Sequence, residues 1–271
     1  MKMKKQKQLY GYALITGATG GLGKAFVYAL AKKGYKLLLT GRSAEKLACL
    51  QAELKATYPE TETHIYSANL QNETDRSSMF SAITAYGHKI GMLVNVAGAD
   101  IQKAFCAYTQ EKIAFQCRVN FEACVSLCKF ALDNRAEGLE IINVSSVSGL
   151  YPMPYFAIYS ATKTALTSFS VALRQEVKKQ GVHVTAVLPG AMPTREDIKM
   201  QIKGQGLWGK LAVKNPSWVA EYSIKSVAKN KAKTIPGFWN KTMRVCTAWI
   251  PTSWKLKFIA RRWSKIQKDA F

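Results

Sequence analysis

The sequence has no stretch of about twenty apolar residues free of charge, which is the length that a membrane-spanning helix needs. The basic start of the chain runs into an apolar segment and then glycine-rich sequence, without the pattern of a secretory signal. The six cysteines form no CxxC pair and no Cys/His cluster with zinc spacing. Cys117, Cys124 and Cys128 share one face of a helical pattern. We therefore expect a cytoplasmic protein with buried, reduced thiols and no metal site.

Acidic residues are scarce, with 17 Asp and Glu against 39 Lys and Arg, for a net charge of +22. The excess lies at the two ends. Residues 199–271 hold 16 basic and 2 acidic residues, and residues 1–7 hold 4 lysines, whereas residues 8–198 hold 19 basic and 15 acidic ones. Such ends suit an anionic partner, with a solvated basic surface as the plainer alternative. No nucleic-acid-binding module is recognisable, so we expect no nucleic acid partner.

Short apolar runs alternate with helical patterns along most of the chain. The expected strands are 12–17, 35–42, 63–70, 91–98, 140–146 and 183–190, and the expected helices are 21–34, 43–59, 73–86, 109–136 and 157–180. This alternation predicts an α/β fold, a doubly wound parallel sheet with helices on both faces, in three layers. We expect one domain over residues 8–198. Residues 199–271 are expected to form substrate-lid helices and a basic amphipathic tail.

The segment TGATGGLG, residues 16–23, lies between the first expected strand and the first expected helix. Glycine there permits a tight turn and close approach of the backbone to a ligand, and the helix N-terminus offers free N–H groups to a phosphate. The spacing is TGxxxGxG, with Gly17, Gly21 and Gly23 as its fixed points, and differs from the GxGxxG of the common dinucleotide fingerprint.

The segment YPMPYFAIYSATK, residues 151–163, places Tyr151, Tyr155 and Tyr159 four residues apart. Only Tyr159 has a lysine four residues further on, at Lys163, which would share its helix face. A neighbouring ammonium stabilises a phenolate and lowers the pKa of the tyrosine, which suits that side chain for proton transfer. The spacing therefore favours Tyr159 as an acid and leaves the other two tyrosines as walls of a pocket.

The order of these segments resembles the short-chain dehydrogenase/reductase family over roughly residues 8–198. The segments that carry the resemblance are TGATGGLG, NVAG at 95–98, Asn120, SS at 145–146, YSATK at 159–163 and PGAMPT at 189–194. The resemblance implies a Rossmann-type fold with a seven-stranded parallel sheet. It also implies a nicotinamide cofactor, hydride transfer between a carbonyl and an alcohol, and a homodimer or homotetramer built through the helices at 109–136 and 157–180.

The resemblance implies a catalytic role for four residues. Tyr159 would protonate the carbonyl oxygen, and Lys163 would tune Tyr159 and bind the nicotinamide ribose. Ser146, thirteen residues before Tyr159, would donate a hydrogen bond to the same oxygen. Side chains alternate along a strand, so only one of Ser145 and Ser146 should face the carbonyl, and the family spacing favours Ser146. Asn120 would order a water that returns a proton to the site.

The resemblance also implies the cofactor site. The residues expected to contact the cofactor are Gly17, Thr19, Gly21, Leu22, Gly23, Arg42, Asn69, Leu70, Asn95, Ala97, Gly98, Tyr159, Lys163, Pro189, Gly190 and Thr194. In the family that the sequence resembles, members that use NAD have Asp at the position of Gly41. Here that position is glycine, and Arg42 follows it. An arginine there suits a 2′-phosphate, so we expect NADP(H) rather than NAD(H), with a surface-turn arginine as the alternative.

Apolar residues in two loops indicate the substrate class. Leu150, Tyr151, Met153, Tyr155 and Phe156 follow Ser146, and Met192, Ile198, Met200, Leu207 and Trp208 follow the PG pair. They suit a hydrophobic carbonyl or alcohol, such as a steroid-, acyl- or lipid-like molecule, unless they pack only against one another. The expected final helix, 254–268, is basic and amphipathic, which suits an anionic membrane surface or packing on the domain or a second subunit.

Two functions therefore remain to be compared. The first is an NADP(H)-dependent oxidoreductase that interconverts a carbonyl and a secondary alcohol. The second is a catalytically silent NADP(H)-binding scaffold or regulator at a membrane surface. The intact set of Ser146, Tyr159 and Lys163 favours the enzyme, because a silent protein has no need of all three.

Overall fold

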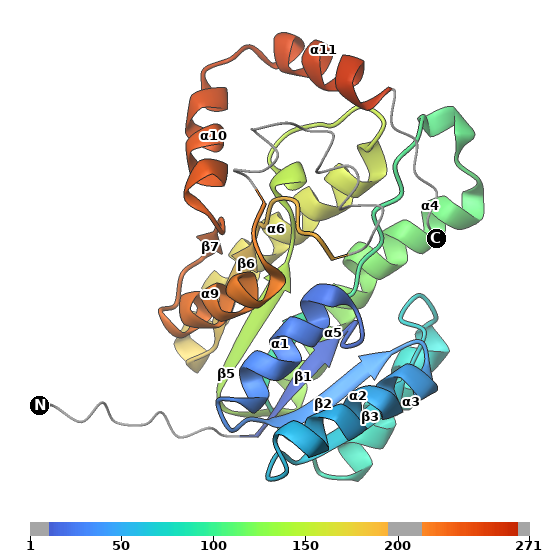
Figure 1. Ribbon diagram of the computed structural model, residues 1–271, viewed down its shortest axis with the longest axis vertical. Coiled ribbons are helices and arrows are strands. Elements are labelled where there is room, and N and C mark those ends of the chain that lie inside the picture. Colours follow the sequence, from blue (N-terminus) through green and yellow to red (C-terminus); the bar gives the residue numbers. More distant parts are fainter. Residues whose placement is uncertain (1–10, 195–212, 265–271) are drawn as a thin grey trace, which may run out of the picture.

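The computed structural model describes residues 11–194 and 213–264 of the chain (Figure 1). Seven parallel strands form one sheet in the order β3-β2-β1-β4-β5-β6-β7. The strands are β1 (Tyr12–Thr16), β2 (Lys36–Gly41), β3 (Thr63–Ser67), β4 (Ile90–Asn95), β5 (Arg135–Val144), β6 (His183–Val187) and β7 (Lys233–Thr234). The strand order reverses direction between β1 and β4. The predicted α/β fold with a doubly wound parallel sheet is confirmed.

Helices cover both faces of this sheet. The apolar sides of α1 (Gly21–Ala31), α2 (Ala44–Thr57) and α9 (Pro216–Ala228) share one core with the sheet. Those of α3 (Glu73–Ala85), α5 (Ala123–Asp133) and α6 (Ala157–Glu176) share the other. The central strands carry leucine, isoleucine and valine on both sides, as a parallel sheet buried between two helical layers requires.

Local sequence explains where several elements begin. Ser43 caps α2 by accepting a hydrogen bond from the Lys46 N–H, as its position before an apolar pattern predicts. Asn215 caps α9 in the same way, with Pro216 in the first turn. Because α9 and β7 complete the helical layer and the sheet, part of the chain after residue 198 belongs to the same fold as the part before it. The predicted boundary at residue 198, with lid helices and a tail after it, therefore falls before these two elements.

The expected helix at 109–136 is interrupted. It consists of α4 (Gln110–Cys117), a π-helical turn η2 (Arg118–Glu122) and α5. A π turn accommodates an extra residue, and such turns often mark functional sites. The prediction that Cys117, Cys124 and Cys128 share one buried face is wrong. Cys124 and Cys128 are buried, but Cys117 is exposed, because the π turn between them rotates the helix before it relative to the helix after it. Three further thiols predicted to be buried, those of Cys49, Cys106 and Cys246, are also exposed.

Two helices end the described chain. We call them the arm: α10 (Phe238–Ala248), which follows the break at Gly237, and α11 (Thr252–Trp263), which follows Pro251. In Figure 1 α10 runs along one side of the molecule and α11 crosses its end. The helix expected over 254–268 thus begins two residues earlier, and its part beyond Ser264 lies outside the described residues. Among the described helices, none is both long and apolar enough to cross a membrane.

Candidate active site

A cavity of about 720 Å³ opens above the carboxyl ends of the strands. Its walls include the loops after β1 and β4, between which the strand order reverses. In open parallel sheets this reversal creates the crevice where ligands bind. All the predicted cofactor contacts except Asn95 line the cavity, and so do Ser146, Tyr159 and Lys163. The fold therefore brings five motifs together around this cavity: TGATGGLG, NVAG, the SS pair, YSATK and PGAMPT.

The glycine loop after β1 forms the tightest part of this wall. A Cβ on Gly23 would lie 2.0 Å from the carbonyl oxygen of Gly17, and Gly17 itself has φ of +61°. A side chain at either position is therefore incompatible with the loop. No side chain caps the start of α1, since Gly20 occupies the cap position. The loop has the compact backbone and uncapped helix start that a dinucleotide pyrophosphate requires, so these residues fit a nicotinamide cofactor.

Lys163 lies on the opposite wall, at the level of the β4 and β5 ends. Its Nζ donates a hydrogen bond to the Val144 carbonyl oxygen at 2.9 Å and lies 5.8 Å from the centre of the Tyr159 ring. The side chain is buried, and this desolvation lowers the pKa of the Lys163 ammonium below its ordinary value, opposed by the charges of Cys124 and Asp100. The helical spacing thus places an ammonium over the face of one tyrosine.

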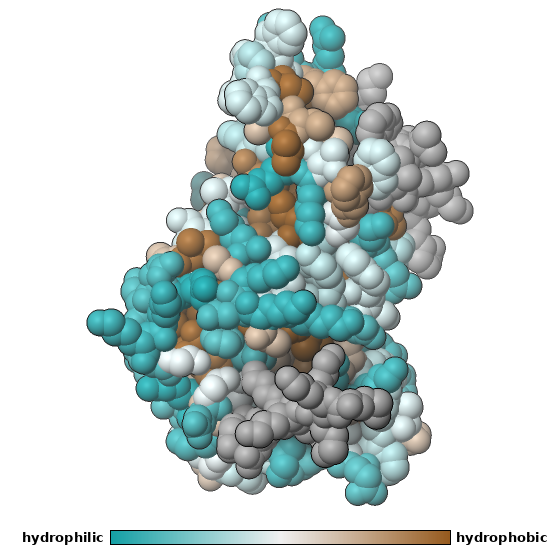
Figure 2. Space-filling model, turned by 90° about the vertical axis from the view of Figure 1, so that its left-hand side faces the viewer, coloured by the Kyte–Doolittle hydropathy of each residue, from teal (hydrophilic) through white to brown (hydrophobic). Residues whose placement is uncertain are grey.

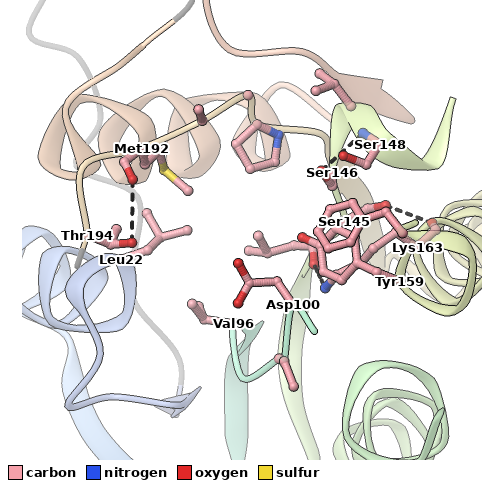
Figure 3. Close-up of a pocket in the computed structure, with 18 of the residues that line it drawn as sticks. Leu22, Val96, Asp100, Ser145, Ser146, Ser148, Tyr159, Lys163, Met192 and Thr194 are labelled. Atoms are coloured by element: carbon pink, nitrogen blue, oxygen red, sulfur yellow. Dashed lines mark hydrogen bonds between the residues drawn. The ribbon is translucent and has the colours of Figure 1, made fainter. Parts of the chain in front are cut away.

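Ser145 and Ser146 have different surroundings. The Ser145 hydroxyl hydrogen-bonds to the Lys163 carbonyl oxygen at 2.7 Å and to the Thr167 hydroxyl at 2.7 Å. The Ser146 hydroxyl accepts a hydrogen bond from the Ser148 N–H at 3.1 Å and keeps its own proton available. Figure 3 shows Ser146, Tyr159 and Lys163 on one side of the cavity, with Leu22, Met192 and Thr194 opposite them.

Two predicted site residues, Asn120 and Asn95, lie behind the cavity wall. The Asn120 side chain accepts a hydrogen bond from the Ala99 N–H at 2.7 Å and donates one to the Ala99 carbonyl oxygen at 2.9 Å. The Asn95 amide donates to Asn143 Oδ1 at 2.9 Å. Both asparagines are buried. Since neither lines the cavity, the prediction that Asn95 contacts the cofactor is not supported by its position.

Arg42 lies at the end of the cavity formed by the loop after β2, near Asn69 and Leu70. Its side chain is exposed, and within residues 11–194 and 213–264 its guanidinium has no ion-pair partner. The Asn69 N–H donates to Asp75 Oδ2 at 2.9 Å, which fixes the loop after β3 beside it. This arrangement places a cationic residue in the cavity wall, after the end of β2.

The predicted apolar wall is only partly present. Leu150, Tyr151, Met153, Phe156 and Met192 line the cavity, whereas Tyr155 does not. Tyr155 has φ of +62°, so the turn before α6 directs it differently from a residue in a helix. Ile198, Met200, Leu207 and Trp208 lie outside the described residues.

The arm supplies lining residues that sequence reasoning missed. They are Trp239, Asn240, Met243 and Arg244 from α10 and Phe258, Ile259, Arg262 and Trp263 from α11. The Trp263 ring stacks on Phe156 at 6.1 Å between centroids, and Phe156 stacks on Tyr159 at 4.4 Å. Asp100 and Gln102, after β4, were also missed. The amphipathic pattern of the last helix was the available signal, but it does not reveal that Pro251 turns the chain back over the cavity.

The comparisons with known proteins agree with this architecture. The family model for short chain dehydrogenases matches residues 11–203. The chain therefore belongs to the short-chain dehydrogenase family of oxidoreductases. Among curated relatives, the very-long-chain 3-oxoacyl-CoA reductase of Bos taurus is 31% identical over 233 residues, covering 83% of this chain and 68% of that protein. The corresponding protein of Macaca fascicularis is 33% identical, covering 68% of this chain, and the chain spans only 60% of its length.

Solved structures show the same fold. A 7β-hydroxysteroid dehydrogenase superposes with a TM-score of 0.82 at 24% identity, covering 95% of this chain and 100% of that one. L-sorbose reductase of Gluconobacter frateurii, solved with NADPH and L-sorbose, superposes with a TM-score of 0.76 at 22% identity, covering 86% and 97%. At this identity the likeness establishes the fold alone.

Proposed function

We propose that the protein is an NADPH-dependent reductase that converts the ketone of a long-chain acyl substrate into a secondary alcohol. The observation that carries the proposal is Tyr159, set between Ser146 and a buried Lys163 in a cavity with an apolar outer wall. The names of the curated relatives, which are 3-oxoacyl-CoA reductases, support an acyl chain as the substrate class.

A bound dihydronicotinamide would supply the hydride that adds to the carbonyl carbon. Tyr159 donates its phenolic proton to the carbonyl oxygen, and the Lys163 ammonium over its ring stabilises the phenolate that remains. Ser146, whose proton is available, donates a hydrogen bond to the same oxygen as charge develops on it. Ser145 instead holds the α6 backbone at Lys163.

That Asn120 orders a water stays a prediction, and the hydrogen bonds of its side chain indicate a structural role as well. Both of its amide protons have protein partners, in Ala99 and Thr162, and its oxygen accepts from the Ala99 N–H. We propose that it is a positioning residue that fixes the loop after β4 against α6. A Cβ on Gly98 would lie 3.1 Å from Asn120 Oδ1 and 3.4 Å from Lys163 Nζ, so this loop, the asparagine and the lysine are packed together.

The cofactor preference follows from charge. Arg42 would hold the 2′-phosphate of NADPH by charge-assisted hydrogen bonds, and the residue before it, Gly41, has no carboxylate to repel that phosphate. The NADPH and NADP complexes among the structural neighbours are compatible with this preference. A homodimer or homotetramer through α4, α5 and α6 remains our expectation for the assembly, and light scattering of the full chain would test it.

The test is the Tyr159→Phe variant, assayed by loss of NADPH absorbance with a long-chain 3-oxoacyl-CoA. We expect kcat to fall by about 10³-fold or more, because the proton donor is lost, while NADPH affinity stays within about threefold. Tyr151→Phe is the matched control, since Tyr151 also lines the cavity but has no lysine four residues on. It should retain turnover within a few-fold.

Two results would contradict the proposal. Turnover by Tyr159→Phe at the wild-type rate would remove Tyr159 from the chemistry. NADPH binding by the wild type without turnover of any ketone in a chain-length panel would instead favour the silent cofactor-binding scaffold.

A further inference from the structure

The exposed apolar residues of the described chain are concentrated on the arm. Eleven large hydrophobic side chains are substantially exposed, and eight of them lie between residues 238 and 258: Phe238, Trp239, Met243, Val245, Trp249, Ile250, Trp254 and Phe258. The arm contributes no buried apolar residue, because α11 buries none and α10 buries only Asn240. Figure 2, which faces the side that carries α10, shows brown and tan side chains between teal ones over the upper part of the molecule.

Two of the most exposed of these residues, both tryptophans, flank the point where the two helices meet. Trp249 is 89% exposed and Trp254 is 70% exposed, and Ile250 and Pro251 lie between them. A monomer rarely leaves such a patch uncovered without a partner for it. Tryptophan is also the side chain that prefers the boundary between acyl chains and headgroups.

The charge of the arm identifies the kind of partner. From Pro236 to Ser264 there are six basic residues and no acidic residue: Lys241, Arg244, Lys255, Lys257, Arg261 and Arg262. A second copy of a chain with net charge +22 would bring like charges together on this face. An anionic bilayer surface suits both the exposed apolar side chains and the basic residues of the arm. The apolar side chains enter the acyl region, while lysine and arginine reach the headgroups.

The lengths of the helices fix how the arm would lie. α10 has 11 residues and α11 has 12. At about 1.5 Å per residue, each is shorter than the roughly 30 Å of a hydrocarbon core. Neither can span a bilayer, so the arm would rest in the interface.

The inner side of the arm lines the catalytic cavity. Phe258 is 68% exposed and also belongs to the cavity wall, as does the half-exposed Met243. From there Trp263 and Phe156 form a stacked aromatic path to Tyr159. Apolar side chains therefore occur both on the outside of the arm and in the cavity wall that leads to Tyr159.

We propose that the arm docks on an anionic lipid surface, with the mouth of the cavity against the membrane, so that an acyl substrate enters from the lipid. The docking stands without the reductase activity, and only the delivery of substrate rests on the proposed function. The shared aromatic wall makes the arm both the membrane contact and the entrance.

Co-sedimentation of the full chain with vesicles tests the docking. The vesicles are phosphatidylcholine with or without phosphatidylserine, and the variant is Trp249→Ala/Trp254→Ala. Neither residue lines the cavity. The matched control is Tyr86→Ala/Phe105→Ala, which removes two exposed aromatic side chains, 73% and 63% exposed, outside the arm. We expect binding that requires phosphatidylserine and falls roughly tenfold or more in the arm variant, with the control like the wild type.

Equal binding by the arm variant and the control would overturn the docking. If added salt then abolished that equal binding completely, the effect would be assigned to basic segments elsewhere.

Activity separates the two proposals. The arm variant should reduce a water-soluble short-chain ketone at the wild-type rate and a vesicle-embedded acyl ketone about tenfold more slowly. Equal rates on the embedded substrate would overturn delivery through the arm. Tyr159→Phe should bind vesicles normally, so a failure of catalysis and a failure of docking give different results.

Discussion

The sheet domain and the arm wall the same cavity, but their side chains are arranged in opposite ways. In the sheet domain, residues such as Leu39, Val94 and Ile142 have no exposed surface. In the arm, most of the large apolar side chains are substantially exposed, and the polar Asn240 is the buried residue. The wall that carries Tyr159 and Lys163 is therefore built on a buried core, and the wall formed by the arm is built on helices whose apolar surface is largely uncovered.

This difference separates two sources of free energy. Burial within one chain stabilises the sheet domain, whereas the apolar surface of the arm gains that stabilisation only when something else covers it. The contacts of the arm with the sheet domain include Asn240 against Gly190, where a Cβ on the glycine would lie 2.8 Å from Asn240 Nδ2, and the ring stack of Trp263 on Phe156. Substitutions in the sheet domain should therefore lower the free energy of unfolding, whereas substitutions on the exposed face of the arm should weaken binding to a partner.

The largest effect on stability is expected in the core. Leu39→Ala removes a fully buried side chain from β2 and leaves a cavity between the sheet and its helices. We expect the free energy of unfolding, measured by urea titration, to fall by about 2–5 kcal/mol. A loss below about 1 kcal/mol would mean that this core is not tightly packed and would weaken the comparison.

The next effect distinguishes two neighbouring serines. Ser146→Ala should lower kcat by about 100-fold, because one donor to the developing oxyanion is lost, and should leave unfolding unchanged. Ser145→Ala removes a hydroxyl bonded to Lys163 and Thr167 and should cost about 1 kcal/mol of stability with kcat within a few-fold. Paired kinetic and urea measurements check both, and the reverse pattern would exchange their roles.

A smaller effect concerns an exposed residue of the sheet domain. Arg42→Ala should raise the Kd for NADPH about tenfold, since charge-assisted bonds to a 2′-phosphate are lost, and should leave NADH binding unchanged. Fluorescence titration with both cofactors measures this ratio. A parallel loss of both affinities would mean that Arg42 supports the loop rather than reads the phosphate.

The same contrast explains which features the sequence could predict. Strands, helices and the glycine loop depend on local periodicity and caps, so the alternation of strands with helices and the Tyr159–Lys163 pair follow from spacing. The π turn at Arg118–Glu122 inserts a residue without changing composition, so Cys117 was placed on the wrong side. β7 has two residues, too few for a pattern, and depends on pairing with β6.

The position of the arm could not be predicted for a related reason. Its helices have a clear apolar stripe, but a stripe does not identify what it contacts. The contact of Trp263 with Phe156, more than one hundred residues earlier, depends on the direction that α11 takes after Pro251. Asn120 shows the same limit in the core: its motif was recognised, but its burial behind Ala99 is a property of the packed structure.

The smallest expected effect on stability, that of Trp249→Ala, tests the contrast between the sheet domain and the arm most directly. Trp249→Ala removes the most exposed large side chain of the arm, and in buffer the free energy of unfolding should change by less than about 0.5 kcal/mol. With phosphatidylserine vesicles present, a ligand that binds only the folded protein raises its apparent Tm, so the wild type should be stabilised more than the variant. Leu39→Ala should show the opposite pattern, with a large loss in buffer and the same gain from vesicles as the wild type. A Trp249→Ala variant that is destabilised in buffer as strongly as Leu39→Ala would mean that the arm is packed against the protein in solution, because a side chain in water has no packing to lose.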